Sequence, residues 1–480
     1  MTDLSVGAAP RRGSLLRHPD FMKLWTGQTI SQFGTQVSLL ALPLIAASTL
    51  NVSPFEFGML GTVEFLPFIL LSLPAGVWDD RLRRRPILIA GDLGRGIALL
   101  SVPIAFGLGV LTIWQLYLVG FIGGCLTVFF DVAYQAYLPE LVERDEILEG
   151  NAKLETSRSA AQVAGPGFAG FAIGLVTAPF AVLLDSVSYF VSAAFMLVIR
   201  RPEPSPEPEK AADGGKGPGM RAQITDGLRY VLGNHYLRYI AAATATSNLF
   251  SNVGGAILVL YLVRELAFTP ELLGLAFSVG SIGALLGAVT ANRFGRWLGV
   301  GPTIVISTMI FGPSFILVAI APANLALPFV VASVFLGSFA SLVYNINQVS
   351  LRQAITPERM QGRMNATMRF IVWGTIPVGT IAGGFLGGII GLHETIWIGA
   401  IGGIFSFLPV LFSPVRSLMT MPEPLEERAP GAQGTDGQVH GAGPGPGDGG
   451  LPLPSLLAEL ADSDLEIGAL SAPTIRPDAD

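Results

Sequence analysis

The sequence predicts an all-α polytopic membrane protein with twelve transmembrane helices in two six-helix halves. Three observations support this fold class. The 480 residues are 51% hydrophobic and only 13% charged, which is more apolar surface than a soluble chain of this size buries. The apolar residues are grouped in twelve stretches of membrane-spanning length. A polar segment, 200–236, separates these stretches into two groups of six.

The predicted segments follow one another along the chain. The N-terminal residues 1–22 are polar and basic, and the first half, 23–199, begins directly after them. Its spans are expected at about 23–48, 55–78, 86–108, 112–137, 158–178 and 180–199. The second half, 237–418, has expected spans at about 239–263, 270–291, 302–321, 325–348, 369–391 and 396–415.

The remaining segments are polar. The linker 200–236 is rich in Pro and Gly and ends in a stretch near 220–232 that favours an interfacial helix. The tail, 419–480, is rich in Gly, Pro and acidic residues and lacks the apolar content for a core. We therefore expect a disordered cytoplasmic tail.

The stretch Gly76–Pro86 determines the expected orientation. It reads GVWDDRLRRRP and joins two apolar runs by a short, strongly basic turn. Arginines beside the end of a membrane helix are retained on the cytoplasmic side. Of the 29 lysines and arginines, all but Arg95 and Arg264 fall in segments that this orientation places in the cytoplasm. We therefore expect a multi-pass protein of the cytoplasmic (inner) membrane with both termini cytoplasmic.

The same turn resembles the signature loop of the major facilitator superfamily. The family pattern Gly-x-x-x-Asp-Arg-x-Gly-Arg-Arg is matched except at the second Gly, where Arg stands. The matching residues are Gly76, Asp80, Arg81, Arg84 and Arg85. The resemblance implies alternating access between two halves, with these residues in the conformational switch. It also implies that Asp131, near the cytoplasmic end of span 4, joins the switch by pairing with Arg84, the alternative being a purely structural pair.

The two halves also repeat. A Ser-Pro pair followed by Gly58 opens the second span, and a Thr-Pro pair followed by Gly274 opens the eighth. Such internal duplication is typical of transporters whose solute site lies near the midplane between two halves.

Ionisable side chains inside apolar spans are costly and are therefore functional candidates. Five occur, all in the first half: Glu64, Asp92, Arg95, Asp131 and Asp185. Glu64 lies roughly 14 Å from the outer end of span 2 at the rise of an α-helix, and hence near the midplane. We expect Glu64 to carry protons in coupling, with Asp131 as a second proton-coupling candidate. A Glu that stays protonated in a hydrogen bond to a neighbour is the alternative.

The other three ionisable residues have structural interpretations. Asp92 and Arg95 are three residues apart on one helix and are expected to neutralise each other. Asp185 is expected near the outer end of span 6, where snorkelling or capping competes with a functional role.

Polar side chains on four spans are expected to line a central cavity. The candidates are Gln28, Ser31, Gln32 and Gln36 on span 1, Tyr134 and Gln135 on span 4, Asn248 and Asn252 on span 7, and Asn347 and Gln348 on span 10. Packing against neighbouring helices is the alternative. A mostly apolar cavity with scattered amides suits bulky amphipathic solutes better than sugars or ions.

Span 5 contains the stretch AQVAGPGFAG, with Gly165, Pro166 and Gly170. It resembles the Gly-x-x-x-Gly-Pro-x-x-Gly-Gly motif of proton-coupled drug exporters, with two glycines replaced by Ala. Small residues permit close helix approach and Pro bends the span. Helix packing alone is the alternative explanation.

The stretches 129–142 and 150–159 resemble the macrolide, siderophore and multidrug efflux branch of the superfamily. This resemblance implies proton-coupled antiport of amphipathic small molecules such as drugs. One alternative is a dedicated exporter of a siderophore, lysolipid or other metabolite, and another is a non-transporting membrane sensor or scaffold.

The expected partners follow from the same reading. The sequence contains no nucleotide loop, metal cluster or nucleophile constellation, so we expect no enzyme activity, no metal and no cofactor beyond the proton gradient. The expected partners are the solute, protons and the lipid bilayer, with no nucleic acid, and the protein is expected to be a monomer.

Overall fold

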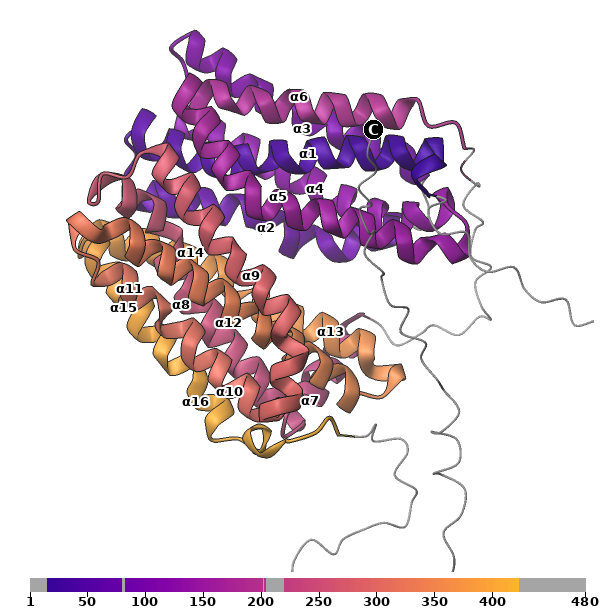
Figure 1. Ribbon diagram of the computed structural model, residues 1–480, viewed down its shortest axis with the longest axis vertical. Coiled ribbons are helices and arrows are strands. Elements are labelled where there is room, and N and C mark those ends of the chain that lie inside the picture. The colour runs from indigo at the N-terminus through magenta and orange to yellow at the C-terminus, as the bar shows by residue number, and fades with distance from the viewer. Residues whose placement is uncertain (1–14, 80–82, 202, 204–219, 423–480) are drawn as a thin grey trace, which may run out of the picture. The chain divides into compact units, whose positions relative to one another are not determined.

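The computed structural model describes residues 15–79, 83–201, 203 and 220–422 (Figure 1). The signature-loop residues Asp80 and Arg81, most of the linker and the tail from residue 423 lie outside these described residues. Gly76 lies within α2, in a stretch whose side chains are not described. Every regular element of the described residues is helical, which confirms the predicted all-α class.

The first half contains six long helices. They are α1 (Pro19–Leu44), continued by a π-helical segment (Ile45–Thr49), α2 (Pro54–Asp79), α3 (Arg84–Gly107), α4 (Ile113–Leu141), α5 (Ile147–Val176) and α6 (Ala178–Leu197).

The linker ends in the short helix α7 (Met220–Gly233), at the stretch expected to form an interfacial helix before the second half begins. The helices that follow are α8 (Leu237–Arg264), α9 (Pro270–Leu298), α10 (Val300–Phe311), α11 (Ile316–Ala319), α12 (Ala326–Ile355), α13 (Glu358–Trp373), α14 (Thr375–Ile389), α15 (Leu392–Ile404) and α16 (Leu408–Leu411). Three spans are interrupted by short breaks: α10 continues into α11, α13 into α14 and α15 into α16. Counted in this way, the described residues contain the predicted 12 membrane-length segments.

Several helices extend beyond the expected spans. α5 begins at Ile147 rather than near residue 158, and α13 begins at Glu358 rather than near residue 369. Hydropathy marks only the part of a helix that crosses the bilayer, whereas the backbone hydrogen bonds continue into the aqueous region. The sequence therefore located the spans but not the helix ends.

Proline and polar caps set the start of α1 and of α9. α1 begins at Pro19, and the His18 ring accepts a hydrogen bond from the backbone N–H of Phe21 at 3.0 Å. α9 begins at Pro270, and the hydroxyl of Thr269 accepts from a backbone N–H of the first turn. The cap side chains accept hydrogen bonds from free backbone N–H groups of the first turn. Pro at the first position has no N–H that would need a partner.

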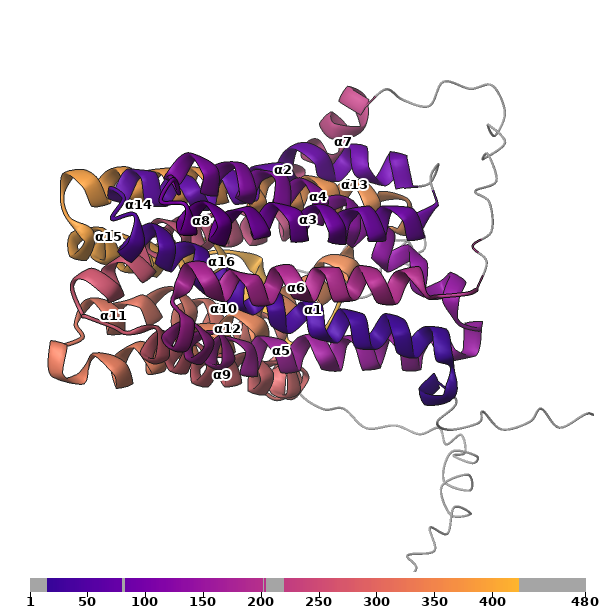
Figure 2. The same cartoon turned by 90° about the horizontal axis from the view of Figure 1, so that it is seen from above.

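Within the first half, α1 packs against α5 and α6, α3 packs against α4 and α6, and α2 packs against α4 (Figure 2). Glycines allow the closest approaches. A Cβ atom on Gly34 of α1 would lie 2.6 Å from the Cβ of Ser188 in α6. In the second half, α9 packs against α12, and α8 packs against α14 and α15.

The halves contact each other through α2 with α14 and through α5 with α9. Both contacts lie toward the ends of the helices that are remote from the basic turn, here called the outer ends. A Cβ on Gly58 would lie 2.8 Å from the Cα of Gly384, and a Cβ on Gly170 would lie 2.9 Å from the Cα of Gly274. Because Gly58 and Gly274 occupy repeated positions, the two contacts are equivalent under the internal repeat.

Candidate transport site

The buried face of α3 carries an ion pair. The Arg95 guanidinium lies 2.6 Å from Oδ1 of Asp92, and its Nε donates to the carbonyl oxygen of Gly91 at 3.2 Å. Asp92 is fully buried and Arg95 is 7% exposed. The expected neutralisation of these two side chains is confirmed.

Two aromatic rings enclose the same guanidinium. Its Cζ lies 4.1 Å from the ring centroid of Phe130 in α4 and 4.4 Å from that of Tyr189 in α6. Rings at this distance attract a cation through their quadrupoles. The Tyr189 hydroxyl in turn lies 3.0 Å from the hydroxyl of Thr35 in α1. Four helices of the first half therefore meet around Arg95.

Asp185 belongs to this buried region, so its side chain neither snorkels to the surface nor caps α6. Its side chain is 1% exposed. α6 begins at Ala178, so Asp185 lies two turns inside the helix and faces α1 rather than the headgroups. The Ser188 hydroxyl donates to its Oδ1 at 3.1 Å, and a Cβ on Gly34 would lie 2.8 Å from that oxygen. A glycine at position 34 therefore leaves the space that the carboxyl group occupies.

Asp131 lies on the exposed side of the same region. It interacts electrostatically with Arg95 and with Arg158 of α5, and its side chain is exposed. The ion pair of Arg84 in the structure is with Glu140, not with Asp131. Asp131 lies nine residues before Glu140 on α4, about 13 Å away along the helix, whereas Arg84 starts α3 at the level of Glu140. The expected pairing is therefore not present in this arrangement of the helices.

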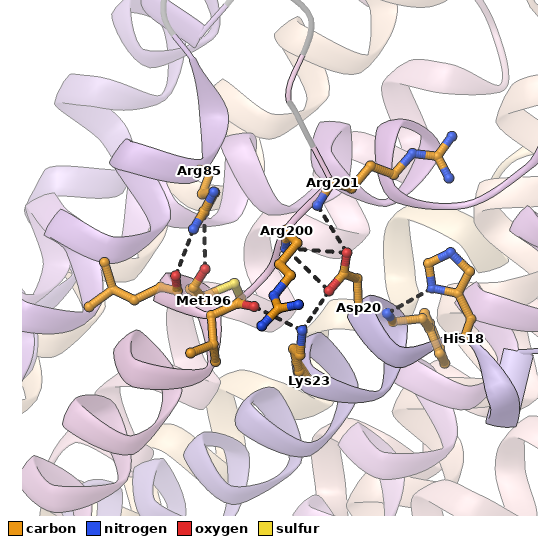
Figure 3. A network of polar contacts seen from close by, with 10 residues as sticks. His18, Asp20, Lys23, Arg85, Met196, Arg200 and Arg201 are labelled. Carbon is orange, nitrogen blue, oxygen red and sulfur yellow. Dashed lines mark hydrogen bonds and ion pairs between the residues drawn. The ribbon is translucent and has the colours of Figure 1, made fainter.

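Arg85, the last residue of the signature pattern, joins the start of α3 to the end of α6. It donates to the carbonyl oxygens of Met196 at 3.0 Å and Leu197 at 2.8 Å (Figure 3). These carbonyls belong to the last turn of α6 and have no partner within the helix. The basic turn therefore caps a helix of its own half.

Asp20 of α1 closes the same end of the first half. Its carboxylate accepts from Lys23 at 2.7 Å and from the backbone N–H of Arg201 at 2.9 Å and of Arg200 at 3.2 Å (Figure 3). The start of the linker is thereby held against α1.

Glu64 lies where α2 contacts α4. A Cβ on Gly120 of α4 would lie 2.8 Å from its Cγ. The side chain is half-buried, and within the described residues it makes no hydrogen bond or ion pair. The alternative interpretation requires a neighbour that is hydrogen-bonded to Glu64, and no described residue has this role.

The expected cavity residues differ in their surroundings. Gln28 is buried and donates to Ser192 of α6 at 3.1 Å. Asn347 is buried and donates to the carbonyl oxygens of Val343 at 2.9 Å and of Ala291 in α9 at 3.4 Å. These contacts lie between helices of a single half, as the packing alternative requires.

The remaining candidates fall into three groups. Ser31 and Gln348 are buried, and Gln348 donates to Asn345 at 3.0 Å. Gln135 is exposed. The half-buried residues are Gln32, Gln36, Tyr134, Asn248 and Asn252.

Two half-buried amides contact neighbouring helices. Asn248 donates to the carbonyl oxygen of Val372 in α13 at 3.3 Å. Gln36 lies against Gly165 of α5, whose missing side chain leaves room for it. Sequence reasoning missed Tyr189, although a phenol group inside an apolar span was a usable signal.

Twelve membrane-length helices in two repeated halves, with ionisable groups at mid-depth in one half, define a secondary transporter of the major facilitator type. The sequence matches the family described as transmembrane secretion effector over residues 12–429. The chain therefore belongs to this family of the major facilitator superfamily.

Characterised relatives are distant. The multidrug efflux pump Tap of Mycolicibacterium fortuitum is 24% identical over 75% of this chain and 88% of its own length. The enterobactin exporter EntS of Salmonella typhimurium is 22% identical over 73% of this chain and 82% of its own length. The uncharacterised transporter YfiS of Bacillus subtilis is 26% identical over 57% of this chain, and the match spans 63% of that relative.

Solved structures have the same fold. An inward-facing bacterial homologue of the iron transporter ferroportin superposes with a TM-score of 0.65 at 17% identity, covering 83% of this chain and 98% of that chain. The nucleoside transporter NupG, as the D323A mutant, superposes with a TM-score of 0.67 at 13% identity, covering 82% of this chain and 98% of that chain.

Proposed function

We propose that the protein exports amphipathic small molecules across the cytoplasmic membrane and takes up protons in exchange. The observation that carries this proposal is Glu64, a mid-depth carboxyl group without a partner among the described residues. Such a group is stable in an apolar environment when it is protonated or beside a cation. Exchange of the proton for a solute couples the two fluxes. The protein works as a monomer with no cofactor.

The contacts between the halves support loading from the cytoplasm. The halves meet toward the outer ends, where the hydroxyls of Thr62 and Thr380 lie 2.7 Å apart. On the cytoplasmic side of the midplane, Asp131, Gln135 and Asn345 are exposed. Alternating access then requires the outer contacts to break and the inner ends to close. The signature-loop residues and Asp131 keep their proposed part in this switch.

The chemistry of the half-buried polar side chains indicates the solute class. Gln32, Gln36, Tyr134 and Asn252 are amide and phenol groups on otherwise apolar helices. Such surfaces bind bulky amphipathic molecules through apolar contact and a few hydrogen bonds. The relationship to a multidrug efflux pump supports the same class.

Transport in reconstituted vesicles tests the proposal. An imposed proton gradient should drive ethidium, a lipophilic cation, across the membrane, and ethidium should release protons from the protein. Glu64→Gln should lower the number of protons released while it still binds ethidium, because Gln keeps the shape but cannot ionise. Glu149→Gln is the matched control, since Glu149 pairs with Lys153 at the surface of α5. If no solute and no proton moves in the wild type, the sensor or scaffold alternative replaces export.

A dedicated metabolite exporter is the second candidate. It is supported by the relationship to an enterobactin exporter, whose sequence identity to this chain (22%) is close to that of the multidrug pump (24%). A panel of ethidium, a macrolide and a catecholate siderophore separates the two. Transport of the siderophore alone favours the dedicated exporter, whereas transport of chemically unrelated solutes favours the multidrug function.

A further inference from the structure

Three carboxylates in the first half surround one buried guanidinium. Arg95 interacts electrostatically with Asp92, Asp131 and Asp185. These four residues, here called the Arg95 cluster, come from α3, α4 and α6. With every group ionised the cluster has two negative charges in excess, and one remains even if Arg158 is counted. Excess charge at mid-membrane is strongly unfavourable, so neutrality requires a bound proton.

An unsatisfied polar atom points to the same conclusion. Oδ2 of Asp92 is buried without a hydrogen-bond partner. The Ser38 hydroxyl of α1 is 7% exposed and lies beside the Asp185 carboxyl group. Buried polar groups are normally paired. The unpaired Oδ2 of Asp92 therefore marks a site that accommodates a change in protonation.

We propose that the Arg95 cluster binds a second coupling proton, held by Asp185 and released to the cytoplasm through Asp131. This inference rests on the proposed proton-coupled export and adds a site separate from Glu64. Asp185 is fully enclosed and lies at the buried end of the cluster, whereas Asp131 is exposed and lies at its open end. On release, the proton passes from a carboxyl group to water, and Arg95 compensates the carboxylate that remains.

Several helices contribute polar or charged side chains to the surroundings of Asp185. α1 contributes the neutral Thr35 and Ser38, and α6 contributes Ser188 and Tyr189. α3 contributes Asp92 and Arg95. Asp131 of α4 acts on Arg95 and reaches Asp185 only through that guanidinium. α5 contributes Arg158, which acts on Asp131. Arg95 is thus the cation at the centre, and its aromatic enclosure by Phe130 and Tyr189 keeps it there.

Counting protons tests the proposal. Ethidium is added to the purified protein in weakly buffered detergent solution, and the protons released per bound ethidium are measured with a pH-indicator dye. We expect two for the wild type, one for Asp185→Asn, one for Glu64→Gln and none for the double variant. Glu149→Gln, outside both sites, should release two. Release of two protons by Asp185→Asn overturns the proposal.

Infrared titration gives a readout that needs no solute. In a Glu64→Gln background, the C=O stretching band of a protonated carboxyl group should appear, should persist when Glu149→Gln is added, and should be lost when Asp185→Asn is added. Asp131→Asn is a second variant at an exposed position, which the fold tolerates. It removes a negative neighbour, so the proton is held less tightly and the band should titrate at lower pH. An unchanged midpoint contradicts a shared proton.

The outcomes separate this inference from the proposed function. If Glu64→Gln releases fewer protons and Asp185→Asn does not, proton-coupled export stands and the second site is refuted. If the wild type releases no proton, the proposed function fails and the coupling role of the cluster fails with it. An infrared band assigned to Asp185 would then show a structural proton.

Discussion

The hydroxyl oxygen of Ser278 in α9 lies 2.9 Å from the backbone nitrogen of Gly167 in α5 and accepts its hydrogen bond. The same hydroxyl donates to the carbonyl oxygen of Val163 at 2.5 Å. In an undisturbed helix these two backbone groups would bond to each other. Pro166 lies between them, so a side chain of the second half contacts both backbone groups beside the proline of α5.

Ser278→Ala should favour opening of the outer end. It leaves two backbone groups of α5 without their bridge, at a cost of about 1–3 kcal/mol to the closed arrangement. A cysteine replacing Val52 in a Cys125→Ala background reports the change. Val52 is 6% exposed, and its carbonyl oxygen accepts from Arg264 of the second half. We expect faster reaction with an impermeant maleimide.

The control is on the same helix. The Ser281 hydroxyl bonds to the carbonyl oxygen of Phe277 in its own helix at 2.7 Å. Ser281→Ala should therefore leave the labelling rate unchanged, and equal rates in both variants would show that the bridge has no role in closure.

Gly384→Ala should also oppose closure. The added Cβ would lie 2.8 Å from the carbonyl oxygen of Pro54 and 3.0 Å from the Cα of Gly58. Backbone atoms cannot move aside as a flexible side chain does, and overpacking of this kind costs about 1–3 kcal/mol. Labelling at Val52 should accelerate and ethidium export should slow. Gly388→Ala is the control, because a Cβ there meets nothing within 4 Å; a similar effect of both substitutions would argue against a steric cause.

The ion pair of Arg84 with Glu140 should survive exchange of the two charges. Arg84→Glu and Glu140→Arg should each slow ethidium export a few-fold, and the double variant should recover, with a coupling energy of about 1 kcal/mol for a partly exposed pair. Transport rates of the single and double variants measure this. Recovery of Arg84→Glu by Asp131→Arg instead would restore the latch expected from the sequence.

Single-cysteine labelling should establish the orientation. In the Cys125→Ala background, a cysteine at the exposed Asn324 should react with an impermeant reagent in intact cells, and one at the exposed Arg144 should react only after permeabilisation. The reason is the confinement of basic residues to one side. Labelling of position 144 in sealed cells would invert the orientation.

The sequence by itself determined the helices and their order. Span length and apolar composition are local properties, so they identified twelve segments, and the three-residue spacing of Asp92 and Arg95 was enough to predict their ion pair. The repeat of Gly58 in Gly274 likewise predicted two equivalent halves.

The tertiary structure alone decided which distant side chains meet. The partner of Arg84, the burial of Asp185 and the bridge from Ser278 depend on the rotation and axial shift of each helix against its neighbours. Hydropathy does not encode these quantities, because a small rotation of one helix changes its partners without changing its composition. The convergence of three carboxylates on Arg95 therefore follows from packing, not from any spacing along the chain.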